Sequence, residues 1–194
     1  MTDWGAHHND IALWGMGMEQ SGPTTIKGEA IGSMIPGGYT AAANYRVDYT
    51  YHNGVTHTCQ STDAANPSGG RVNDGQRHGV TFKGENGWIF VTRGDIQASD
   101  PDLLTDPLPA SAERLYVSSN HRANLIDCAR TRKAPICEVN IGHRSASVCH
   151  LGVISMRLGR ALQWNPKTQQ FVGDRDANQW LAREMRAPWG YDSV

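Results

Sequence analysis

The sequence lacks the features that mark several large classes of protein. It has no excess of either charge, because 18 Lys and Arg stand against 19 Asp and Glu, for a formal net charge of -1. Nucleic acids and anionic membranes attract a clustered excess of basic residues, so neither is expected as a partner. No segment approaches the ~20 apolar residues of a membrane-spanning helix, and no basic and apolar leader follows Met1. We therefore expect a cytoplasmic protein.

Cysteine is scarce, and its spacing excludes two common uses. The four cysteines are Cys59, Cys128, Cys137 and Cys149. They include no Cys-x-x-Cys pair, so the sequence contains neither a zinc ribbon nor a redox motif of that kind. We expect reduced thiols that are mostly buried.

The glycine-rich nucleotide motifs and the nucleophile elbow are also missing. Gly15-Met16-Gly17 resembles the start of a dinucleotide fingerprint, but it ends a helical pattern and no third glycine follows in register. Neither a Gly-x-x-x-x-Gly-Lys-Ser/Thr loop nor a Gly-x-Ser-x-Gly turn occurs. The chain alone is therefore not expected to be an NAD(P)-dependent dehydrogenase.

What the sequence does contain is an alternation of helical and strand patterns. Apolar spacing predicts helices over 3–18, 120–133, 144–158 and 174–186. Short β-rich runs fill residues 23–117, and Asn-Gly turns predict two hairpins, pairing 44–52 with 55–60 and 80–83 with 88–92. Residues 61–76 are rich in Asn, Asp, Ser and Gly, which favours an exposed loop.

These elements predict one α+β domain over residues 1–194. A chain of 194 residues matches the usual length of a single domain. Helix, then strands, then helices is the α+β order, in which late helices cover one face of a sheet. We therefore predict an open antiparallel or mixed β-sheet with helices on one face.

The first predicted helix carries a stripe of side chains suited to acid-base chemistry. At about 100° per residue, Asp3, His7, Asp10 and Trp14 fall within about 60° of one another. A carboxylate one turn from an imidazole orients its tautomer and raises its basicity, as a general base acting on a hydroxyl requires. The alternative is that Asp3 caps the helix while His7 faces solvent.

Other histidines are candidates for binding. Neighbouring His7 and His8 diverge by about 100° on a helix and are not expected to share one ion. His143 and His150 are about 10 Å apart along a helix axis, too far to bind one zinc together. The candidate substrate-binding residues are His8, Trp14, His143 and His150, with hydrogen-bonded structural roles as the alternative for the last two.

The first hairpin predicts a second polar cluster. A two-residue Asn53-Gly54 loop pairs Thr50 with His57, which places Asp48, His52 and His57 on one side of the hairpin. These three are candidate metal ligands, and this polar side suits a sugar, a metal or a second subunit, with plain solvent exposure as the alternative. The opposite side carries apolar and aromatic side chains that suit packing against helices: Tyr45, Val47, Tyr49 and Tyr51.

The start of the chain resembles a known signature. Residues 2–12 are similar to the Asp-x-Gly-x-His-x-x-Asp motif of the Gfo/Idh/MocA family, with its four positions taken by Asp3, Gly5, His7 and Asp10. Further stretches that resemble members of this family follow in order at 124–128, 132–137, 142–145, 148–152 and 186–189.

The resemblance implies half of a two-domain enzyme. It implies an N-terminal Rossmann domain for NAD(P), a C-terminal α+β domain with an open sheet, and an active site between them. It further implies that His7, oriented by Asp3, is the acid-base residue for oxidation of a sugar or polyol hydroxyl, joined by a lysine from a Glu-Lys-Pro motif. The sequence has neither that motif nor the nucleotide-binding domain, so hydride transfer lacks its acceptor and we expect no NAD(P) binding by this chain alone.

Two classes of function follow. The first is an isolated substrate-binding and oligomerisation domain, which takes a carbohydrate-like small molecule and forms a homo-oligomer through the open sheet. The second is a standalone enzyme in which zinc or manganese, with His7 as a possible additional ligand, assists hydrolysis of an ester, phosphoester or glycoside in the pocket of His7 and Asp3. We favour the first, because the sequence shows no compact spacing of metal ligands.

Overall fold

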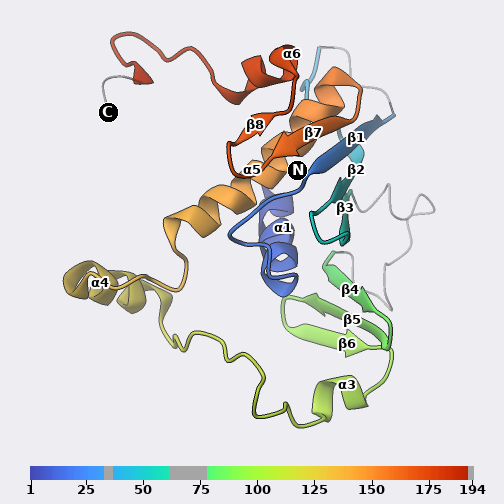
Figure 1. Cartoon of the computed structure of the whole chain (residues 1–194), viewed down its shortest axis with the longest axis vertical. Coiled ribbons are helices and arrows are strands. Elements are labelled where there is room, and N and C mark those ends of the chain that lie inside the picture. Colours follow the sequence, from blue (N-terminus) through green and yellow to red (C-terminus); the bar gives the residue numbers. More distant parts are fainter. Residues whose placement is uncertain (33–36, 62–77, 192–194) are drawn as a thin grey trace.

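The computed structural model of the chain describes residues 1–32, 37–61 and 78–191 and has the predicted α+β class (Figure 1). Its helices are α1 (Trp4–Gly15), α3 (Asp102–Thr105), α4 (His121–Thr131), α5 (Val139–Leu158), α6 (Arg175–Asn178) and the 3-10 turn η1 (Gln179–Leu181). Its strands are β1 (Thr25–Ile31), β2 (Asn44–Thr50), β3 (Thr56–Gln60), β4 (Val80–Gly84), β5 (Gly87–Thr92), β6 (Asp95–Ala98), β7 (Leu162–Asn165) and β8 (Gln170–Phe171).

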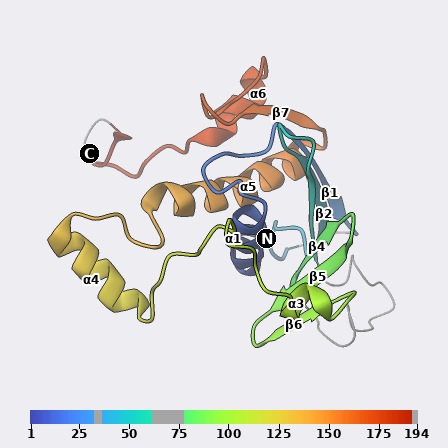
Figure 2. The same ribbon diagram turned by 60° about the horizontal axis from the view of Figure 1, so that its bottom comes forward.

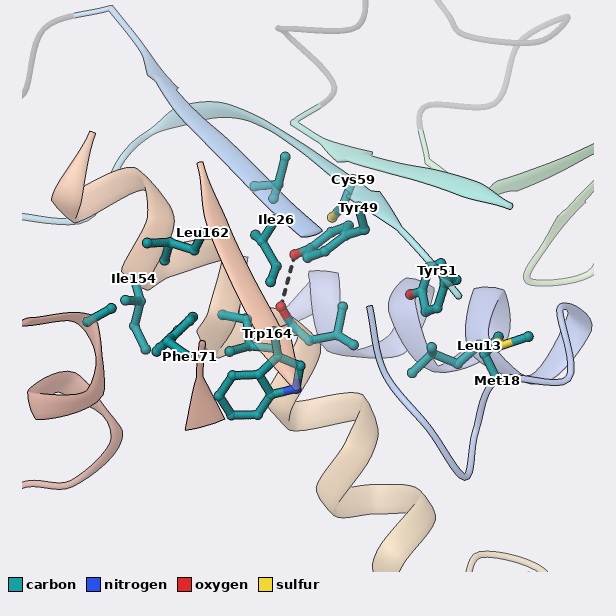
Figure 3. Close-up of a cluster of buried hydrophobic side chains, with 14 of the residues drawn as sticks. Leu13, Met18, Ile26, Tyr49, Tyr51, Cys59, Ile154, Leu162, Trp164 and Phe171 are labelled. Carbon is teal, nitrogen blue, oxygen red and sulfur yellow. Dashed lines mark hydrogen bonds between the residues drawn. The ribbon is translucent and has the colours of Figure 1, made fainter. Parts of the chain in front are cut away.

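The larger sheet has five antiparallel strands in the order β3-β2-β1-β7-β8, and α5 packs against β1 on one of its faces. Side chains alternate between the two faces of a strand. The face toward α5 carries the core (Figure 3), which confirms the predicted packing of the tyrosine side of the hairpin. The hydroxyl of Tyr49 donates to the backbone oxygen of Val148 in α5 at 2.9 Å. The opposite face is polar, with Lys27, Arg46 and Asp48 among its residues.

A second, three-stranded sheet in the order β4-β5-β6 is an addition to the single sheet predicted from the sequence. The β4–β5 hairpin is confirmed, with Lys83 paired to Trp88. Strand β6 extends it after Gly94, whose φ of +80° suits the turn between Thr92 and Asp95. This sheet packs through β4 against α1, as Figure 2 also shows.

The register of the first hairpin differs by one residue from the prediction. Tyr49 pairs with His57 and Asp48 with Thr58, because the loop has three residues, 52–54, closed by a bond from the N–H of Tyr51 to the oxygen of Val55 at 3.0 Å. Gly54, at φ +82°, takes the left-handed position that such three-residue loops require. A shift of one residue moves side chains to the other face, so His57 lies on the tyrosine side.

Two helix boundaries also differ. Helix α5 begins at Val139, five residues before the predicted start, because the side chain of Glu138 accepts a hydrogen bond from the N–H of Asn140 and caps it there. Its end at Gly159, with φ +64°, is as predicted. The helix predicted over 174–186 stops at Leu181, because the residues after it are exposed and short helices without a buried face are unstable in water.

The remaining sequence predictions have mixed outcomes. All four cysteines are free, and Cys59, Cys128 and Cys149 are buried, as expected. The loop predicted over 61–76 lies, apart from Ser61, outside the described residues. Among the residues that are described, no helix has both the length and the apolar character needed to cross a lipid bilayer.

Candidate functional site

A cavity of about 1030 Å³ lies between α1, strand β3 and the β4–β5 hairpin. A spacing of four residues puts Trp4, His8 and Ala12 on one face of α1, and all three line the cavity. Strand β3 contributes His57, Thr58, Cys59 and Gln60, and the hairpin contributes Phe82 and Trp88 among others. Aromatic rings combined with a few polar groups are typical of a small-molecule site.

Trp4 and His8 form a ring cluster with two residues of the β4–β6 region, His78 and Arg93. The ring centroids of Trp4 and His78 are 5.2 Å apart, and the guanidinium carbon of Arg93 lies 4.8 Å from the Trp4 centroid. Nδ1 of His8 donates to the backbone oxygen of Trp4 at 2.9 Å. Burial lowers the pKa of His8 below its ordinary value, so the neutral ring keeps Nε2 as an acceptor.

Asn9 is the most deeply buried polar residue of the cavity wall, with no exposed surface. Its Nδ2 donates to Sγ of Cys149 in α5 at 3.1 Å. Its Oδ1 is buried and has no hydrogen-bond partner within the part of the chain that the structure describes. Such an acceptor normally has a partner, so this oxygen is an unsatisfied polar atom directly behind the cavity surface.

Cys59 and Tyr45 line the same cavity. Burial raises the pKa of the Cys59 thiol to about 11 and also raises that of the Tyr45 hydroxyl. Because the thiolate is the nucleophilic form of cysteine, Cys59 is a neutral, weakly reactive group at pH 7. Both side chains therefore line the cavity and act as neutral hydrogen-bond donors.

The predicted acid-base stripe lies on a different side of α1 from the cavity. Asp3 and His7 are exposed, and their side chains make no hydrogen bond with any described residue. The side chain of Asp3 does not cap the helix. His7 contacts Trp4 edge to face, with ring centroids 5.8 Å apart. The carboxylate-imidazole pair expected from the spacing is thus not hydrogen-bonded, although both groups remain accessible.

Asp10, the third predicted catalytic residue, is a contact between helices. Its Oδ1 accepts a hydrogen bond from the hydroxyl of Ser145 in α5 at 2.5 Å. Ser145 is buried and lies one turn of α5 before Cys149, the partner of Asn9. Two neighbouring polar residues of α1 therefore attach it to α5, which fixes the orientation of its cavity face.

The predicted metal cluster of Asp48, His52 and His57 does not assemble, because of the shifted hairpin register. Asp48 lies on the polar face of the sheet, where it accepts from Arg46 at 2.8 Å. His52 is exposed in the loop, whereas His57 lines the cavity. Within the described ranges, no group of three or more His, Cys, Asp or Glu side chains could hold a metal ion. The metal-assisted hydrolase hypothesis gains no support from this arrangement.

Of the four predicted substrate-binding residues, the structure places only His8 in the cavity lining. Trp14 borders a separate apolar hollow of about 260 Å³ with Phe82 and Leu115. Nε2 of His143 lies 2.6 Å from Oε1 of Gln169, which is the structural alternative considered for it. His150 is exposed on α5.

Sequence reasoning did not single out Trp4, Asn9 or His78. The spacing of Trp4, His8 and Ala12 was a usable signal, since it marks one helix face. Asn9 carried no signal, because its importance comes from the unpaired oxygen that its burial creates. His78 comes next to His8 only through tertiary structure, with ring centroids 5.4 Å apart.

Comparisons with solved structures support the fold. An NAD-binding protein from Listeria innocua aligns with a TM-score of 0.53 and 14% identity, over 83% of this chain and 46% of that chain. The aldose-aldose oxidoreductase from Caulobacter crescentus, solved with glycerol, aligns with a TM-score of 0.52 and 16% identity, over 82% of this chain and 45% of that chain. This chain therefore spans less than half of either protein. No curated protein matches the sequence.

The comparison with family models covers nearly the whole chain. Residues 1–191 match the model described as the C-terminal alpha/beta domain of the Gfo/Idh/MocA oxidoreductase family. The match includes every described helix and strand. The chain belongs to the Gfo/Idh/MocA oxidoreductase family, and it contains that family's C-terminal alpha/beta domain.

Proposed function

We propose that this chain is the substrate-binding domain of a Gfo/Idh/MocA-type oxidoreductase and that it takes a carbohydrate-like small molecule in the cavity beside α1. The family membership gives the oxidoreductase context. The cavity, at about 1030 Å³, has room for a sugar. Its lining offers both aromatic surface and polar groups.

The observation that carries this proposal is the unpaired Oδ1 of Asn9. A buried acceptor without a partner costs about 1–3 kcal/mol, and Asn9, the residue that carries this one, is part of the cavity wall, with the oxygen itself covered. A sugar hydroxyl is a donor of the right chemistry to satisfy it, once the side chains that cover the oxygen move aside. Nε2 of His8, the residue before Asn9 in α1, accepts from a second hydroxyl in this proposal.

Aromatic side chains support the same ligand class. Trp4 and Trp88 line the cavity, and Trp4 is half exposed. The apolar C–H face of a sugar ring packs well against such surfaces. The Caulobacter crescentus relative in fold was solved with glycerol, a polyol, which is consistent with the hydroxyl-rich ligand that we propose here.

The acid-base role of His7, oriented by Asp3, is part of this proposal by family resemblance. Both side chains face solvent on the side of α1 away from the cavity lining. A proton transfer at His7 thus needs a second surface that covers this side of α1 and excludes water. We propose that a nucleotide-binding domain supplies it.

We also propose that this domain does not hold NAD(P) by itself. All paired strands in the described ranges are antiparallel. A dinucleotide pyrophosphate is normally held where a parallel strand turns into a helix N-terminus. Nicotinamide, bound by a separate domain, would supply the hydride acceptor, while the residues of this chain bind and orient the sugar.

Oligomerisation through the open face of the larger sheet stays a prediction. That face is polar, with a network in which Arg46 and Thr58 both donate to Asp48, at 2.8 and 2.6 Å. Association there would have to proceed through hydrogen bonds and bridging water rather than through apolar burial.

The experiment is a binding titration of the purified chain with a panel of aldoses and polyols, followed by NMR chemical shifts. We expect the shifts to concentrate at residues 4–12 and 56–60. His8→Ala should weaken binding about tenfold, equal to about 1.4 kcal/mol, and Asn9→Ser should weaken it further. His150→Ala, an exposed histidine outside the cavity, is the matched control.

A parallel titration with NADH, followed by fluorescence, tests the proposal that this domain does not hold NAD(P) by itself. No binding of NADH with retained sugar binding is the expected result. Tight NADH binding would overturn the statement that this domain does not hold the dinucleotide. Absence of any response to the sugar panel, or an equal loss in His150→Ala, would overturn the assignment of the cavity.

A further inference from the structure

One part of the chain begins beside the second sheet and then extends away from both sheets (Figure 1). We call residues 101–138 the arm; it comprises α3, an extended stretch, α4 and the turn that leads into α5. Figures 1 and 2 both show α4 far from the sheets, next to the beginning of α5 only. The arm is long enough to carry a surface of its own.

The arm is ordered by bonds within itself. Helix α4 is capped by Asn120, whose side chain accepts from the N–H of Ala123 at 2.9 Å. The side chain of Asn124 donates to the Tyr116 hydroxyl at 2.8 Å and accepts from the N–H of Ile136 at 3.0 Å. The segments before and after α4 are thus tied to one face of the helix, and its other face is left uncovered.

Large apolar side chains are exposed along the arm. Leu125 and Ile126 on α4 are 60% and 51% exposed, and Val117 is 93% exposed. The others are Leu103, Leu104, Leu108, Leu115 and Tyr116. Clusters of exposed apolar residues of this extent mark surfaces that a partner covers.

Charge on the arm and its root is divided into two halves of opposite sign. Residues 100–113 contain four acidic residues, Asp100, Asp102, Asp106 and Glu113, and no basic one. Residues 114–133 contain five basic residues and one acidic one, with Arg130, Arg132 and Lys133 at the end of α4. All of these charged residues are exposed.

We propose that the arm pairs with the arm of a second copy of this chain, antiparallel and about a two-fold axis. A two-fold interface requires a self-complementary surface, and an acidic half followed by a basic half meets that requirement. In the antiparallel pair each acidic half faces the basic half of the other copy, and the apolar side chains between them become buried. A polyanion would meet the basic half but be repelled by the acidic half, so it fits less well.

This inference is independent of the proposed sugar site, because no residue of the pairing halves other than Leu103 lines the cavity. It also differs from association through the open sheet, whose outer face is polar. The two modes of association can be separated by experiment.

The test is sedimentation equilibrium of the full chain with charge-reversed variants. One variant carries Arg130→Glu, Arg132→Glu and Lys133→Glu; the other carries Asp100→Lys, Asp102→Lys and Asp106→Lys. We expect the wild-type chain to be a dimer and each variant to dissociate at least tenfold more readily. An equimolar mixture of the two variants should form a heterodimer, because one acidic-basic contact is then the native one and the other is restored with exchanged signs.

A third variant, Lys27→Glu with Lys167→Glu and Arg175→Glu, alters as many exposed charges outside the arm and should stay dimeric. Circular dichroism checks that every variant is folded, and recovery of the dimer in the mixture also requires folded partners. A monomeric wild type, a dimer that resists both arm variants, or a mixture that stays monomeric would each overturn the proposal. A dimer broken only by the third variant would place the interface on the sheet instead.

Discussion

The imidazole of His57 lies against two phenol rings, that of Tyr49 in strand β2 and that of Tyr51 just after it. Its centroid is 5.1 Å from that of Tyr49 and 6.4 Å from that of Tyr51, with the planes nearly parallel. Burial lowers the pKa of His57 from 6.5 to about 4. The folded protein therefore holds this histidine neutral under conditions in which the unfolded chain protonates it.

This difference predicts an acid sensitivity of stability. Between pH 6.5 and about 4 the unfolded state binds more protons at this site than the folded state, so the free energy of unfolding falls as the pH is lowered. The slope from one such group is at most about 1.4 kcal/mol per pH unit. Urea unfolding at a series of pH values measures it, and His57→Phe, which keeps the ring but not the proton, should flatten the profile in this window.

A variant destabilised for another reason provides the control. Val47→Ala removes two buried methyl groups from the same sheet face and should lower stability equally at each pH, by about 2 kcal/mol. If His57→Phe retained the wild-type slope, the protonation of His57 would not be its cause.

The positions of individual histidines show which parts of the site could be predicted from the sequence. His8 was among the predicted binding residues and lines the cavity. His57 was predicted for the wrong face, because loop length, which sets hairpin register, is ambiguous when Asn-Gly can close either a two- or a three-residue loop. The roles of His7 and Asp3 stay predictions.

At the scale of elements, the closeness of α5 to the larger sheet depends on two glycines that face each other. A Cβ at Gly28 would lie 2.8 Å from Cγ of Met156 and 2.9 Å from the backbone oxygen of Gly152. A Cβ at Gly152 would lie 2.5 Å from the Tyr49 hydroxyl, which is bonded to Val148. Helix and sheet are therefore in backbone contact at this point.

Gly152→Ala should lower the free energy of unfolding by about 1–3 kcal/mol, the usual cost of overpacking a dense core. Gly142→Ala in the same helix is the matched control, because a Cβ there meets nothing within 4 Å. Alanine is the better helix former by up to about 1 kcal/mol, so this second variant should be stabilised. Denaturant unfolding of both variants tests the pair, and equal effects would contradict this account of the packing.

Helix positions were more predictable than helix ends. The middle of α1, α4 and α5 follows from apolar periodicity, and the glycine at 159 marked the end of α5. The early start of α5 depends on the Glu138 cap, a weaker N-terminal signal than Ser, Thr, Asp or Asn. The second sheet was not predicted as a separate unit because short strands do not reveal which sheet they join.

At the scale of the whole molecule, backbone protection differs sharply between the arm and the larger sheet. Strand β1 pairs with β2 along its whole length and with β7 at Thr25 and Ile26, and α5 packs on it. Helix α4 has its apolar face open to solvent. Segments with few buried contacts open locally at low free-energy cost.

Limited trypsin digestion of dilute protein should therefore cut after Arg122 and Arg130 in α4 well before it cuts after Lys27 in β1, although all three side chains are exposed. Mass spectrometry of the early fragments measures the order. Raising the protein concentration should slow the cuts in α4 if arms pair. Cleavage after Lys27 at the same rate as in α4 would contradict the difference in local stability.

The sequence by itself determined the α+β class, the family, the buried side of the first hairpin and the cores of the main helices, because these follow from periodicity, turn residues and motif spacing, which are local properties of the chain. Only the tertiary structure decided which residues share a cavity, since His8, His57 and His78 come from three elements. The tertiary structure also leaves Oδ1 of Asn9 without a partner among the described residues, and it places α4 away from the sheets. Burial and its absence are products of packing, and packing depends on contacts between residues far apart in the chain.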